Sequence, residues 1–114
     1  MSADVHITRA EDYWDSEEAP IQFSEWERLV DGSPDLDRQD GQRMYRDSET
    51  DDVVWSGHPD PNFQAWLVHR EGRIFTSNPD QPFIKRMYAI AVSLDANVQG
   101  DETERYDADG RQLA

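Results

Sequence analysis

The strongest periodic pattern in this 114-residue chain is an apolar stripe that follows a hairpin signal in its second half. The segments AWLVHR and RIFTSN flank Glu71-Gly72, a two-residue connection of the kind that joins antiparallel strands. Asn78-Pro79 then predicts an N-cap with proline at the first helical position. Apolar residues follow at the spacing of one helix face: Phe83, Ile84, Met87, Ile90, Ala91 and Leu94. Because such a stripe has to be buried, this half of the chain predicts a helix packed on an antiparallel sheet.

The first half of the chain predicts two shorter elements. Residues 4–8 (DVHIT) alternate polar and apolar side chains, as a strand does. The segment FSEWERLVDG predicts a helix with Ser24 as N-cap, Glu27 as its capping-box partner and Gly32 just past the end. One side of this helix carries Trp26, Leu29 and Val30.

Weaker signals complete the pattern. Residues 53–55 (VVW) form a β-prone run, and the turn at Gly100-Asp101 predicts a last small hairpin. Between Ser33 and Asp52 the chain is polar, with a faint strand signal at Met44 and Tyr45. Together these elements predict a single small α+β domain over residues 1–114, with a mainly antiparallel sheet and two helices packed on one face. Residues 107–114 are predicted to be a flexible acidic tail, and the order of the strands stays open.

The net charge of the chain is −14, and it is unevenly distributed. Residues 1–60 hold seventeen acidic residues against five arginines, whereas residues 61–95 hold three acidic and four basic ones. A soluble domain needs a far smaller net charge to stay in solution, and self-repulsion destabilises the compact state. The excess therefore indicates a use: a negative field speeds association with a basic partner and repels nucleic acid and anionic lipid.

Composition favours a folded protein of the cytoplasm. Four tryptophans, four tyrosines and four phenylalanines supply the bulky side chains that disordered chains lack. The absence of cysteine excludes disulfides and thiol catalysis and fits a reducing compartment. The N-terminal segment has no apolar core of a secretory signal, and no apolar run reaches membrane-spanning length. We therefore expect a cytoplasmic protein that binds neither membrane nor nucleic acid.

Residues that could carry chemistry are few and scattered. His6, His58 and His69 show none of the paired spacings of zinc sites, and the acidic strings lack the twelve-residue pattern of a calcium loop. The chain has no Gly-x-Ser-x-Gly, no phosphate-binding glycine loop and a single lysine. The sequence therefore predicts no enzyme, no metal site and no cofactor. His69 is expected to be structural or solvent-facing, while His58 lies in a loop where either turn geometry or a partner contact explains it.

The tryptophans divide into two groups. Trp26 and Trp66 lie in periodic elements and are predicted to belong to the core. Trp14 lies in the acidic string EDYWDSEE, where it is equally a lid on the core or a contact residue, and Trp55 ends a strand beside a loop. A large ring flanked by acidic residues is typical of an interface anchor.

Several strings resemble a pattern found in short acidic bacterial proteins. They are ITRAEDYW, SEWERLV, SPDL, WSGHP and NPD with VQGDETERY, and they extend the similarity over residues 5–106. The group resembles immunity proteins, the small partners that neutralise toxins of interbacterial competition. The resemblance implies a cytosolic, non-enzymatic inhibitor that binds one cognate toxin tightly. It carries no particular inhibitory residue with it, since these proteins diverge most at the surface that meets the toxin.

Electrostatics then selects the predicted contact residues. An acidic inhibitor can occupy the basic cleft of a toxin as a surrogate for phosphate. The acidic nucleic-acid mimic, directed against a host or phage defence protein, is the alternative, and a small enzyme is the third. The sequence leaves open the activity of the toxin, the geometry of inhibition and the oligomeric state. The predicted partner-binding residues are Asp15, Glu17, Glu18, Asp47, Glu49, Asp51, Asp52, Trp55 and His58.

Overall fold

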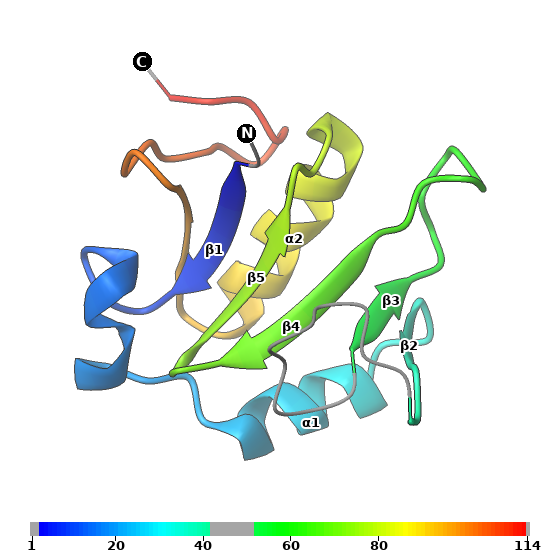
Figure 1. Ribbon diagram of the computed structural model, residues 1–114, viewed down its shortest axis with the longest axis horizontal. Helices are drawn as coiled ribbons and strands as arrows, with labels where there is room; N and C mark the ends of the chain where they lie inside the picture. Colours follow the sequence, from blue (N-terminus) through cyan, green and yellow to red (C-terminus); the bar gives the residue numbers. More distant parts are fainter. Residues whose placement is uncertain (1–2, 42–51, 114) are drawn as a thin grey trace.

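The first strand of the chain lies inside the sheet, between strands from the second half (Figure 1). This computed structural model describes residues 3–41 and 52–113. The six described strands form one antiparallel sheet in the order β2-β3-β4-β5-β1-β6, which confirms the predicted α+β class. In chain order the elements are β1 (Asp4–Thr8), the 3-10 helix η1 (Tyr13–Glu18), α1 (Phe23–Asp31), β2 (Leu36–Arg38), β3 (Val53–Trp55), β4 (Trp66–Arg70), β5 (Arg73–Ser77), α2 (Gln81–Ser93) and β6 (Asn97–Gly100).

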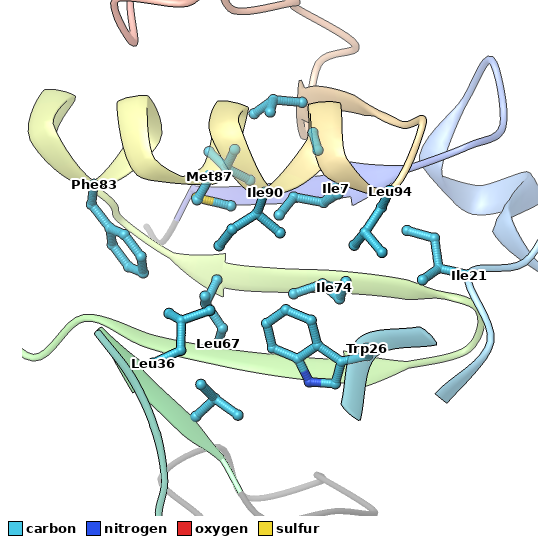
Figure 2. Close-up of a cluster of buried hydrophobic side chains, with 14 of the residues drawn as sticks. Ile7, Ile21, Trp26, Leu36, Leu67, Ile74, Phe83, Met87, Ile90 and Leu94 are labelled. Carbon is cyan, nitrogen blue, oxygen red and sulfur yellow. The ribbon is translucent and has the colours of Figure 1, made fainter. Parts of the chain in front are cut away.

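Helices α1 and α2 pack on the same face of the sheet and share one core (Figure 2). Strand register places Ile7 opposite Ile74 and Val98, and all three side chains point into this core. The predicted stripe of α2 is buried along its whole length, from Phe83 to Leu94. From α1, Trp26 and Val30 are buried, whereas Leu29 is only partly so.

The opposite face of the sheet is apolar as well. Register pairs Val68 with Phe75 and Phe75 with His6, and the three side chains are buried there. Trp66 also lies on this face, with its ring 6.3 Å from that of Phe75 in an edge-on arrangement. The prediction that Trp66 belongs to one core with Trp26 is therefore wrong: Trp66 is only partly buried and lies on the face of β4 opposite the helices.

Both predicted N-caps are displaced by two residues. Helix α1 begins after Gln22, whose side chain accepts from the third helical N–H while Glu25 bonds back to the backbone of Gln22. Helix α2 begins after Asp80, whose carboxylate accepts from the N–H of Phe83. Ser24 is exposed within α1. Asn78 instead anchors the start of the chain, since its side chain accepts from Ala3 N at 2.8 Å.

The other parts of the sheet compare with the sequence predictions in different ways. The hairpin at Glu71-Gly72 is confirmed, with both residues at positive φ, as the tight β4–β5 turn requires. Strand β2 is an addition, because the string LDR carries no strand pattern. The Met44 and Tyr45 signal lies outside the described residues.

The C-terminal segment folds back beyond β6. Tyr106 forms a bridge with Gln112, and Leu113 N donates to Arg105 O at 2.8 Å. The flexibility predicted for residues 107–114 stays a prediction.

Candidate partner-binding surface

Trp14 is the most exposed aromatic side chain among residues 3–41 and 52–113. It lies on η1 with 60% of its surface accessible. The same short helix carries the exposed Glu17 and Glu18 and the partly exposed Asp15. Three of the predicted contact carboxylates therefore share a short helix with an exposed indole, and Trp14 is no lid on the core.

The base of η1 is fixed by ring stacking and backbone hydrogen bonds. The ring of Tyr13 lies parallel to the imidazole of His6, with ring centroids 3.9 Å apart. Tyr13 N donates to Gln99 Oε1 at 2.7 Å, and Gln99 Nε2 donates to Glu11 O at 3.0 Å. Gln99 is buried in β6, so the sheet itself sets the position of the residue before Trp14.

A second set of contacts holds the middle of η1. The buried hydroxyl of Ser16 lies 2.7 Å from that of Thr8 in β1 and donates to Tyr13 O at 2.5 Å. Gly72 packs directly beneath, because a Cβ atom built there would lie 2.7 Å from Ser16 O. The polar groups on the buried side of η1 thus have hydrogen-bond partners inside the protein. The side chains of Trp14, Glu17 and Glu18 are exposed to solvent.

His6 connects η1 to β5 and to the turn after β6. Arg73 Nε donates to His6 Nδ1 at 3.1 Å, so Nε2 carries the proton and donates to Asp101 Oδ1 at 3.0 Å. The other oxygen of Asp101 accepts from Asp4 N at 2.9 Å. Burial lowers the pKa of His6 below its usual 6.5, and Arg73 lowers it further, against the opposing pull of Asp101. The imidazole is therefore held neutral: the Arg73 donor occupies Nδ1, where a second proton would go, and the Asp101 acceptor faces the proton on Nε2.

We expect the pKa of His6 to make the protein less stable in mild acid. The unfolded chain takes up a proton near pH 6.5, while the folded protein does so only at its lower pKa. Stability is thus fully present above pH 6.5 and falls as the pH drops from there through the folded pKa. Urea unfolding at several pH values measures this slope.

His6→Gln supplies the control, because its side-chain amide can donate to Asp101 without titrating. The slope between neutral pH and the folded pKa should flatten in this variant and persist in His69→Gln. An unchanged slope in His6→Gln would assign the acid sensitivity to other groups.

Trp55, at the end of β3, and His58, in the loop that follows, form a cluster separate from η1. Their rings lie 5.5 Å apart, and His58 stacks on Phe63 at 4.2 Å. Asp60 N donates to His58 Nδ1 at 2.9 Å, which leaves Nε2–H to donate to Asp80 at 2.8 Å. His58 thus fastens its loop to the start of α2, and its side chain is only 5% exposed. This favours the structural explanation for His58 over a contact role.

Asp35 fixes the other side of Trp55. The indole N–H donates to Asp35 Oδ2 at 3.0 Å, and Arg86 donates to both oxygens of the same carboxylate. Arg86 lowers the pKa of Asp35 below its usual value and so keeps it ionised. Sequence reasoning missed this pair, although Asp35 lies in the quoted string SPDL.

The structure does not bring the predicted contact residues into one site. Helix η1 packs on β1 and β5, at the other side of β4 from β3. The end of β3, where Trp55 lies, and η1, which carries Glu17, are therefore on opposite sides of the molecule (Figure 1). Asp52 is fully buried at the start of β3 and presents no surface carboxylate. Asp47, Glu49 and Asp51 lie outside the described residues. The candidate surface is therefore η1 alone, with Trp14, Asp15, Glu17 and Glu18.

Other kinds of site find little support in the described parts of the chain. Residues 3–41 and 52–113 contain no cluster of three histidine or acidic side chains placed to hold a metal ion. Their helices also fall short of the length and apolar character that a membrane crossing requires. His69 donates from Nε2 to Ile21 O at 2.6 Å, in line with the structural role expected for it.

Comparison with known proteins adds no relative. No protein-family model, no curated protein and no solved structure matches this chain.

Proposed function

We propose that this protein is a non-enzymatic inhibitor of the immunity type, which neutralises a basic toxin in the cytoplasm through η1. The observation that carries the proposal is the 60% exposure of Trp14 on an element whose other exposed side chains are carboxylates. A large exposed ring on a rigid support provides buried area in a complex at little entropic cost. Its acidic neighbours would pair with lysine or arginine of the toxin.

Electrostatic steering gives the second part of the mechanism. A protein with net charge −14 attracts a basic partner over distances beyond contact, and the carboxylates of η1 orient the final approach. Because η1 is held by Tyr13 and Ser16, it needs no reordering on binding. The two effects predict fast association governed by charge and slow dissociation governed by Trp14.

Association kinetics with the product of the adjacent gene test the proposal. Neutralising η1 in Asp15→Asn/Glu17→Gln/Glu18→Gln should slow association about 3- to 30-fold at low salt, within the range that steering provides. The difference should nearly vanish at high salt, where the Debye length falls to roughly 3 Å at 1 M. Trp14→Ala should instead speed dissociation about 30-fold, as a hot-spot residue worth about 2 kcal/mol does.

A matched variant separates local contact from total charge. Asp37→Asn/Asp40→Asn/Asp60→Asn removes three exposed carboxylates away from η1, and asparagine at 60 can still accept from Asn62 N. It should slow association less than the η1 triple variant does. Equal effects of the two triple variants would remove η1 from the mechanism, and a neighbouring gene product that does not bind would contradict the immunity assignment.

A further inference from the structure

A second surface has the opposite character to η1. A pocket of about 320 Å³ lies between the end of β3 and α2, lined by Trp55, Pro82, Lys85, Arg86 and Ala89. Its walls are the indole, the proline ring, a methyl group and the aliphatic stems of the two basic residues, so an apolar group is its natural occupant. The volume is at the low end for ligand pockets and suits one aromatic side chain.

The walls of this pocket are preformed. Trp55 stacks on the buried Phe83 at 5.7 Å, and its N–H is bound to Asp35. Arg86 donates to Asp35 through Nε at 2.9 Å and through Nη2 at 3.1 Å. The same two hydrogen bonds fix the aliphatic stem of Arg86, which lines the pocket. The site therefore needs no rearrangement to receive an aromatic ring.

The rim of the pocket is basic, in a strongly acidic protein. Lys85, the only lysine of the chain, is exposed and forms no ion pair within residues 3–41 and 52–113. An adjoining hollow shares Pro82 and Lys85 and adds Arg111, together with one carboxylate, Asp109. The occupant that matches is an aromatic side chain flanked by carboxylates.

The protein itself carries such a group. Trp14 is exposed on η1, directly before Asp15 and in the same short helix as Glu17 and Glu18. We propose that a second copy of this chain inserts Trp14 into the pocket at Trp55 and Ala89, with the η1 carboxylates facing Lys85. The inference deepens the proposed function, since self-association would cover the surface offered to the toxin and the two would compete.

The positions of the two surfaces make the contact head-to-tail. Helix η1 packs on β1 and β5, whereas the pocket borders β3, two to three strands away across the sheet (Figure 1). One copy therefore cannot fill its own pocket, and each copy offers one Trp14 and one pocket. Such heterologous contacts form rings or open chains rather than a twofold dimer.

The contact should be weak, and it should be weakened both by very low and by high salt. One side chain and its neighbours bury far less area than a stable interface does. At 0.01 M salt the Debye length of roughly 30 Å leaves two molecules of charge −14 repelling each other, while at 0.15 M it falls to about 8 Å and the local pairing dominates. At high salt the pairing is screened as well. Association should therefore be strongest near physiological salt.

Sedimentation velocity at millimolar protein concentration and three salt concentrations tests the inference. The wild type should sediment faster than a monomer, most clearly at intermediate salt. Trp14→Ala and Ala89→Glu should each remain monomeric, because one lacks the ring and the other blocks the pocket from an exposed helix position. An equimolar mixture of the two variants should form dimers and nothing larger, since only one complementary pair of surfaces remains.

Val92→Glu serves as the control, because it adds the same charge to α2 at an exposed position outside the pocket. It should associate as the wild type does. A monomeric wild type at all three salt concentrations would overturn the inference, and so would a mixture of variants that stays monomeric. Ala89→Glu leaves η1 intact, so it should still bind the toxin, and loss of self-association alone leaves the proposed function standing.

Discussion

Replacing Trp26 with alanine should lower the free energy of unfolding by about 3–5 kcal/mol, the cost of removing a large buried aromatic side chain. Trp26 is 2% exposed and packs in the core between α1 and the sheet (Figure 2). Its loss leaves a cavity in the core cluster that also contains Leu67 of β4 and Ile74 of β5. These two strands cannot move to fill the cavity without losing the register of their pairing. Because a small domain has a stability of only about 5–15 kcal/mol, the variant should be close to unfolded at 37 °C.

Trp14→Ala is the matched control, because it removes the same side chain from an exposed position. Its free energy of unfolding should stay within about 0.5 kcal/mol of the wild type. Urea unfolding followed by circular dichroism measures both variants, and the midpoint should move at constant slope. Comparable losses in the two variants would mean that η1 belongs to the cooperative core.

The second large effect is expected at Gly72. Its φ of 81° lies in the left-handed region, and a Cβ there would approach Ser16 O to 2.7 Å and Pro20 Cβ to 3.0 Å. Gly72→Ala should therefore incur roughly 1–2 kcal/mol for the backbone conformation and about 1–3 kcal/mol for the collision. The collision is with the backbone of η1, so the variant should also displace Trp14.

Gly41→Ala separates the two contributions. Gly41 has a φ of 76°, yet no atom lies within 4 Å of a Cβ built there. This variant should lose only the conformational part, about 1–2 kcal/mol. Urea unfolding gives the stabilities, and the fluorescence of Trp14, compared with that of Trp14→Ala in each background, reports on η1. If the two variants lose the same free energy of unfolding and the fluorescence of Trp14 is unchanged, the collision with η1 has no measurable cost and this prediction is wrong.

The helices were predictable because their apolar spacing decides which side is buried. The stripe from Phe83 to Leu94 needs no knowledge of the rest of the fold. Helix starts were not predictable to the residue, since Ser24 and Gln22 compete as caps and the chain before α1 decides between them. Its path is set by Ile21, whose N–H donates to Gly72 O at 2.9 Å. No local pattern contains that contact.

The candidate surface was predictable in part. Asp15, Glu17 and Glu18 stand out by charge, and Trp14 by its acidic neighbours. The support beneath them was not, because His6, Arg73 and Asp101 meet only through pairings far apart in the sequence. Alternation in β1 did place His6 on the face opposite Ile7, but a polar residue there is ordinarily read as solvent-facing. Burial on both faces of the sheet emerges only from the assembled fold.

The position of β1 has a consequence for how the protein is made. Val5 pairs with Thr76 on one side and with Gly100 on the other, so β1 leaves the ribosome before either of its partner strands. Pairings this distant make folding slow, because the intervening chain has to be ordered before they form. Until β6 emerges, the growing chain exposes an unpaired strand edge, which is open to pairing with other chains.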